Sequence, residues 1–87
     1  MVRKHKNYVV IDKGNYEMHV MIRLYRNMQG WTQEKLARKC GLSRNTISSI
    51  ETGQYCVTAF HAGLICRALH VEFEELFRIR KKIKEEF

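Results

Sequence analysis

Residues 43–54 carry the side chains best suited to chemistry in this 87-residue chain. If the segment is helical, at about 100° per residue, one face is polar and the opposite face carries Ile47 and Ile50. The polar face consists of Arg44, Asn45, Ser48, Ser49 and Thr52. It offers hydrogen-bond donors and acceptors but no carboxylate. Such a face suits a negatively charged partner that presents hydrogen-bonding edges.

Two short helices joined by a tight turn are expected to position this polar face. Thr32 can cap the first helix, and Gly41 can end it because glycine adopts the left-handed conformation that a helix end requires. Ser43 can cap a second helix that runs from Arg44 to about Thr52, and Gly53 ends it. The pattern predicts a helix-turn-helix unit.

The run from Thr32 to Gly53 resembles the helix-turn-helix of the Cro and phage-repressor family of DNA-binding proteins. The matching features are Thr32-Gln33, Ala37 with Gly41, Leu42-Ser43, Ile47, and Ile50-Glu51 followed by Gly53. The resemblance extends from about Ile22 to Phe77. It implies a lambda repressor-like bundle and a sequence-specific regulator of transcription. We expect a repressor, although the sequence specifies neither the operator, the regulated genes nor the direction of regulation.

The resemblance also implies which residues contact DNA. If the second helix lies in a major groove, base contacts fall to Arg44, Asn45, Ser48 and Ser49. Backbone contacts fall to Arg26, Gln33, Ser43, Thr46, Gly53 and Gln54. Arginine can bind guanine, and asparagine adenine, through two hydrogen bonds each. Alternatively these are plain surface side chains, and the implied pair between Arg26 and Glu51 is an ordinary surface ion pair.

Composition agrees with a nucleic-acid partner. Sixteen Lys and Arg against nine Asp and Glu give a net charge of +7, which also serves solubility. Three cysteines without a CxxC motif argue against a disulfide framework, so we read Cys40 and Cys66 as apolar fillers in a reducing compartment. No apolar run is long enough to cross a bilayer. We therefore expect a cytoplasmic protein without membrane contact.

The expected fold class is all-α: five helices, a short N-terminal extended segment and a lengthened C-terminal helix. We divide the chain into a basic arm (1–14), a helix-turn-helix domain (15–77) and a helical extension (78–87). The first helix is expected from Asn15 to about Gln29, and the fourth from a Thr58 cap to Leu69. Residues 8–11 form a strand-like run that must pair within the arm, pair with a second copy, or lie over the helices. The arm follows phosphates or merely packs.

Apolar residues outside the motif predict a partner surface. Its members are Phe60, Leu64, Ile79, Ile83 and Phe87. A second copy is the expected occupant, although the tail could instead fold back over its own domain. Two bidentate readers supply about 1–3 kcal/mol each, whereas specific sites exceed random DNA by about 4–10 kcal/mol. We therefore expect a homodimer on a palindromic duplex site.

Other functions fit less well. The chain has no glycine-rich phosphate loop, no paired carboxylates in an apolar setting and no local nucleophile–base pair, so we expect no enzyme and no cofactor. Cys66 and His70 have metal-ligand spacing but lack a second pair, so no metal is expected. The remaining alternative is an antitoxin or adaptor that binds a protein at the C-terminal extension. Membrane-surface binding by the basic tail is weaker.

Overall fold

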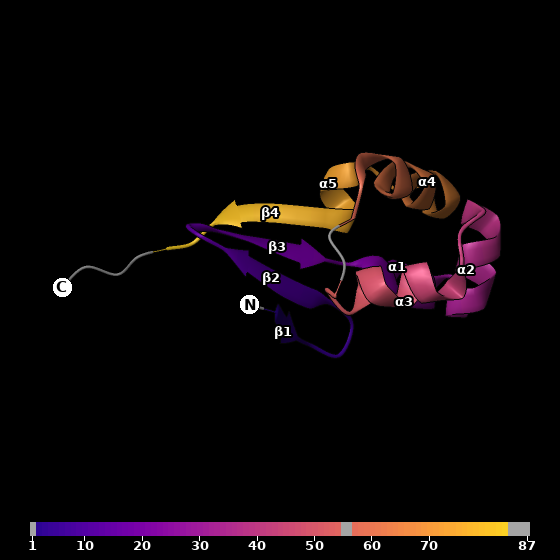
Figure 1. Ribbon diagram of the computed structural model, residues 1–87, viewed down its shortest axis with the longest axis horizontal. Coiled ribbons are helices and arrows are strands. Elements are labelled where there is room, and N and C mark those ends of the chain that lie inside the picture. The colour runs from indigo at the N-terminus through magenta and orange to yellow at the C-terminus, as the bar shows by residue number, and fades with distance from the viewer. Residues whose placement is uncertain (1, 55–56, 84–87) are drawn as a thin grey trace.

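A four-stranded antiparallel sheet joins five helices in the computed structural model, which describes residues 2–54 and 57–83 (Figure 1). The all-α prediction is therefore wrong. The strands are β1 (Val2–Lys4), β2 (Val9–Lys13), β3 (Tyr16–Val20) and β4 (Phe77–Lys81), in that order across the sheet. Three strands come from the N-terminal end of the chain and one from the C-terminal end. The sheet projects away from the helices, as Figure 1 shows.

The hairpin of β2 and β3 replaces the first half of the helix predicted from Asn15 to Gln29. Only Gly14 and Asn15 connect the strands, and Gly14 has φ 60°, which suits the first position of a two-residue hairpin turn. The register pairs Val9 with Val20. The strand-like run at residues 8–11 thus pairs within its own chain. Helical spacing of apolar residues after Asn15 misled the prediction, because the run Tyr16–Val20 also fits a strand.

Strand β4 replaces the first part of the predicted C-terminal helix. Phe77 and Ile79 alternate with Arg78 and Arg80 as in a strand, although Leu76, Ile79 and Ile83 also fit one face of a helix. Within the described residues β4 pairs with β3 alone, and Val20 lies opposite Phe77. A partner so distant in sequence cannot be inferred from the residues around β4 itself, and the lengthened helix was the wrong choice.

The five helices follow the expected caps more closely. They are α1 (Ile22–Met28), α2 (Gln33–Cys40), α3 (Arg44–Glu51), α4 (Ala59–Leu69) and α5 (Phe73–Leu76). The side-chain oxygens of Thr32, Ser43 and Thr58 each accept a backbone N–H at 3.1 Å, as predicted. Gly41 ends α2 with φ 71°. His70 takes the same left-handed conformation after α4, at φ 57°, where glycine is usual.

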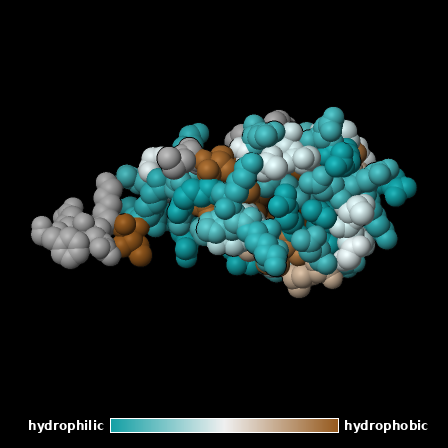
Figure 2. Space-filling model, turned by 90° about the horizontal axis from the view of Figure 1, so that it is seen from below, coloured by the Kyte–Doolittle hydropathy of each residue, from teal (hydrophilic) through white to brown (hydrophobic). Residues whose placement is uncertain are grey.

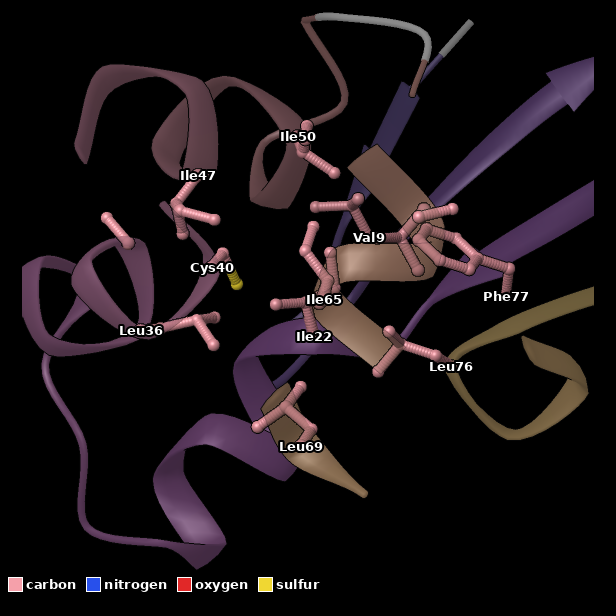
Figure 3. Close-up of a cluster of buried hydrophobic side chains, with 13 residues drawn as sticks. Val9, Ile22, Leu36, Cys40, Ile47, Ile50, Ile65, Leu69, Leu76 and Phe77 are labelled. Carbon is pink, nitrogen blue, oxygen red and sulfur yellow. The ribbon is translucent and has the colours of Figure 1, made fainter. Parts of the chain in front are cut away.

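One hydrophobic core holds the sheet and the helices together (Figure 3). The sheet contributes Val9, Val20 and Phe77 from one face, which we call the core face. The helices contribute Ile22, Leu36, Ala37, Cys40, Ile47, Ile50, Ala62, Ile65, Leu69 and Leu76. Side chains two residues further along the strands, Ile11 and Met18, remain on the core face and pack at its margin. The base of the sheet is thus part of the body's interior.

Candidate nucleic-acid interface

Helix α3 presents the polar face expected from the sequence. Ile47 and Ile50 are 0% and 2% exposed and anchor the helix in the core. Arg44 and Asn45, at the N-terminal end, are exposed, and Ser48 is half-buried, as is the adjoining Ser49. The described structure therefore brings the four predicted base-contacting residues to one accessible surface. Whether they contact bases stays a prediction.

The start of α3 is fixed by two hydroxyl groups. The Ser43 Oγ accepts the Thr46 N–H at 3.1 Å and lies 2.8 Å from the Thr46 Oγ1. The capping role of Ser43 is confirmed. Both hydroxyls also lie at a helix N-terminus, where the partial positive charge of the helix dipole favours an anion. This location is compatible with the predicted phosphate contacts of both residues.

The end of α3 places Gly53 and Gln54 in a closing turn. Gly53 has φ 74° and donates its N–H to the Ile50 carbonyl at 3.2 Å, while the Gln54 N–H donates to the Ser49 carbonyl at 3.0 Å. The two backbone donors expected to hold phosphate thus already close the helix. The side-chain amide of Gln54 belongs to an exposed residue and is the donor better placed for an anion.

A buried carboxylate ties α3 to the two preceding helices. Glu51, 2% exposed, accepts the Arg26 Nε at 2.8 Å and the Arg26 Nη2 at 3.0 Å. It also accepts the Gln33 Nε2 at 3.2 Å and the Arg23 Nε at 3.3 Å. Removing one partner of such a buried pair costs about 3–5 kcal/mol, because the other charge is left uncompensated. The pair fixes α3 against α1 and α2.

The same network changes the interpretation of Arg26. Its remaining nitrogen, Nη1, donates to the Trp31 carbonyl at 2.7 Å, and its side chain is 11% exposed. The pair with Glu51 is therefore buried rather than an ordinary surface pair. Arg23, with 35% of its side chain exposed, is a cation on the outer side of this network that the sequence analysis missed. Its position one helical turn before Arg26 on α1 was the available signal.

Cations also surround Trp31 at the start of the motif. The Lys39 and Lys35 ammonium groups lie 4.8 and 5.8 Å from the centre of the indole ring. Trp31 packs at the margin of the core rather than inside it. Viewed from below, most of the surface is hydrophilic, and hydrophobic atoms form small separate groups on it (Figure 2).

The predicted partner surface is divided between two elements. Phe60, 74% exposed, and the partly buried Leu64 lie on α4. Ile79, 60% exposed, lies on β4, and Ile83, 91% exposed, follows it. Phe87 lies outside the described residues. The predicted apolar stripe along one tail helix is therefore not formed, although each described member except Leu64 is exposed.

Other chemistry finds little support in the part of the chain that the structure describes. Within that part, His, Cys, Asp and Glu nowhere form a group of three or more that could hold a metal ion. Burial raises the pKa of the Cys40 thiol, and Cys40 behaves as a core filler. Among the described helices, none combines the length and apolar character needed to span a bilayer.

Comparison with known proteins shows that the helical body matches a protein family. A family model described as "Helix-turn-helix" matches residues 22–76. An uncharacterised HTH-type transcriptional regulator of Methanothermobacter thermautotrophicus is 41% identical over 61 residues, covering 69% of this chain and 88% of that protein. The crystal structure of the restriction-modification controller protein C.AhdI from Aeromonas hydrophila superposes with a TM-score of 0.62 at 36% identity, covering 64% of this chain and 85% of that one. The hypothetical transcription factor NHTF from Neisseria gives 0.61 at 36% identity, covering 63% of each chain.

Proposed function

Because the chain belongs to the helix-turn-helix family of DNA-binding transcriptional regulators, we propose that it binds a palindromic duplex site as a homodimer, with α3 in the major groove. The family model covers residues 22–76, well over half of the chain, and this match confirms the resemblance to Cro and phage-repressor proteins. The base contacts, the palindrome and the dimer are our proposals.

The observation that carries the proposal is the exposed pair Arg44 and Asn45 at the start of α3. The N-terminal residues of a recognition helix are those that reach base edges. The Arg44 guanidinium can bind guanine O6 and N7, and the Asn45 amide can bind adenine N6 and N7. The carboxylate of Glu51 is buried with its cationic partners, so no acid of α3 opposes the phosphates.

The proposed homodimer follows from the free energy that base contacts can supply. Each bidentate contact supplies about 1–3 kcal/mol of base discrimination, and a specific site needs about 4–10 kcal/mol over random DNA. Arg44 and Asn45 of one copy reach only the lower end of that range. Two copies on two half-sites reach its middle, and a two-fold protein requires a palindromic site.

Selection from random duplex oligonucleotides, at two salt concentrations, tests the proposal. We expect an enriched palindrome at both concentrations, because base contacts persist while phosphate contacts weaken with salt. Arg44→Ala should relax the preference at one base position per half-site by about 1–3 kcal/mol. Arg67→Ala, an exposed arginine of α4, is the matched control and should leave the selected sequence unchanged. Equal enrichment profiles for wild type and Arg44→Ala would contradict base recognition by α3.

We also propose that the protein represses transcription in the cytoplasm. Repression by occupancy requires no surface beyond the DNA interface and the dimer contact. Among the described residues Cys40 and Cys66 are free thiols, in agreement with a reducing compartment. A reporter gene behind the selected site should lose expression when the protein is supplied, and a rise in expression would indicate an activator.

A further inference from the structure

The sheet lies outside the part of the chain that matches the helix-turn-helix family. Strands β1, β2 and β3 precede residue 22, and β4 follows residue 76. The sheet therefore adds a surface to the helical body. Its two edges differ: β1 has three residues, whereas β4 has five. β4 bonds to β3 on one side and to no strand on its other side within the described ranges. Such an edge is a template for pairing with another strand.

Charges along the β4 edge change sign from one end to the other. Glu72, Glu74 and Glu75 lie at the start of the edge, on and just before α5, and all three are exposed. The basic end consists of Arg78, Arg80, Lys81 and Lys82. A second copy that lies antiparallel along this edge therefore meets opposite charges at both ends.

We propose that β4 pairs antiparallel with β4 of a second copy, so that two sheets join into one of eight strands. This inference rests on the homodimer of the proposed function and gives it an interface. The two-fold axis places each copy's α5 beside the partner's basic strand end. The complementarity is the reason to choose a second copy of this chain over a foreign protein as the occupant.

An apolar row supports a register centred on Ile79. Ile79 pairs with Met18, which pairs with Ile11, so the three side chains share the core face of the sheet. Ile79 is 60% exposed at the edge. When the Ile79 side chains of the two copies lie opposite each other, the apolar row of Ile11, Met18 and Ile79 continues across both sheets. Both isoleucines then lose contact with water.

This register sets Arg78 opposite the partner's Arg80, and both arginines already have hydrogen-bonding or ionic partners in their own copy. The Arg78 Nε donates to the Glu75 carbonyl at 3.1 Å, and its Nη2 lies 3.4 Å from the Tyr25 Oη, which in turn donates to the Glu75 carboxylate. The Arg80 Nε lies 3.5 Å from the Glu17 carboxylate. The Glu17 carboxylate thus offsets part of the repulsion between Arg80 and the partner's Arg78.

The same symmetry keeps both recognition helices on one side. A two-fold axis perpendicular to the joined sheet leaves the core faces of both sheets on the same side. Gly53, at the end of α3, lies against this face: a Cβ built there would be 2.9 Å from Val2 Cγ1 and 3.5 Å from Ile11 Cγ1. Both α3 helices therefore project from one side, as two half-sites on one duplex require.

The oligomeric state of the full chain, measured by sedimentation equilibrium, tests the proposal. Ile79→Lys should raise the dimer dissociation constant at least tenfold. Tyr16→Lys is the matched control, because Tyr16 is 53% exposed on the same face but on the interior strand β3. It should change the constant less than threefold, and circular dichroism should show both variants folded. A dimer lost with Tyr16→Lys but kept with Ile79→Lys would indicate face-to-face packing and overturn the proposal.

A charge exchange tests the antiparallel arrangement separately. Glu74→Lys and Lys81→Glu should each weaken the dimer about fivefold at low salt, since the symmetry doubles every contact. The double variant should return close to the wild-type constant. No recovery in the double variant would overturn the arrangement, as would capture of a different protein on the β4 edge of a monomer.

These outcomes separate the interface from the proposed function. A dimer that is insensitive to Ile79→Lys overturns the β4 interface and leaves the homodimer standing. A wild-type chain that stays monomeric on its own and on the selected palindrome overturns both. Base preference that depends on Arg44, measured on a duplex with one half-site, tests α3 independently of either result.

Discussion

The helical body and the sheet of this protein are held in different ways. Within the body, α1, α2 and α3 follow each other through short turns, and side-chain caps fix the starts of α2 and α3, as in Thr32 with Lys35 and Ser43 with Thr46. The sheet instead joins the two ends of the chain, since β3 pairs with β4. The body matches known helix-turn-helix proteins, and the sheet lies outside that match. Local order thus accompanies the family match, whereas long-range pairing holds the part of the chain that lies outside that match.

The two regions still share one interior. Phe77 on β4 is 1% exposed and packs in the same cluster as Ile22 and Leu76. The Met21 N–H at the start of α1 donates to the Leu76 carbonyl at 2.8 Å. The body and the sheet therefore differ in whether local or long-range contacts form their secondary structure. Because they share one core, we expect both regions to unfold together.

Phe77→Ala should have the largest effect on this comparison. Loss of a buried phenylalanine leaves a cavity and costs about 3–5 kcal/mol of unfolding free energy. Because Phe77 lies in the common core, urea unfolding followed by helical circular dichroism and by strand amide hydrogen exchange should shift together. Ile83→Ala, at a 91% exposed position, is the control and should stay within about 0.5 kcal/mol of wild type. A sheet that opens while α3 stays protected would show two separate units.

Alanine substitutions at two glycines test the contact between the sheet and the end of α3, with a smaller expected effect on stability. Gly41 and Gly53 have φ of 71° and 74°, so alanine strains both by about 1–2 kcal/mol. An added Cβ meets nothing within 4 Å at Gly41 but lies 2.9 Å from Val2 Cγ1 at Gly53. Gly53→Ala should therefore cost about 1 kcal/mol more than Gly41→Ala in thermal unfolding. In a Val2→Ala background the excess should vanish; an excess that persists would mean that β1 does not press on α3.

Acid should lower the stability of the shared fold through two carboxylates of the sheet, with the smallest effect of the three predictions. Hydrogen bonding to His19 and then to Arg3 lowers the pKa of Glu17. Desolvation tends to raise the pKa of Asp12, but bonds from Lys82 and the charge of Arg3 outweigh it and leave that pKa lowered. A carboxylate with a lowered pKa in the folded state stabilises above its unfolded pKa and loses that contribution as the pH falls. The protection factors of the strand amides, which correct for the slower intrinsic exchange in acid, should fall below about pH 4, and Glu17→Gln should flatten this dependence. Protection factors that fall with pH as steeply in Glu17→Gln as in wild type would contradict this prediction.

The helix-turn-helix could be predicted because its signals are local. Thr32, Gly41 and Ser43 each act on residues within one helical turn, so the sequence around them contains both partners of every interaction. The orientation of α3 also followed, since Ile47 and Ile50 leave only one face for Arg44 and Asn45. The burial of Arg26 did not follow, because it depends on Glu51 and Trp31 closing around it in space.

The sequence by itself determined the paired helices, their caps and the polar, acid-free face of α3, because periodicity and capping act over a few residues. Only the tertiary structure decided that residues 16–20 and 77–81 are strands, since Met18 and Ile79 suit either a helix or a strand until the backbone of each finds a partner. Backbone hydrogen bonds between distant segments settle that choice, and among the described residues they leave the outer edge of β4 unpaired.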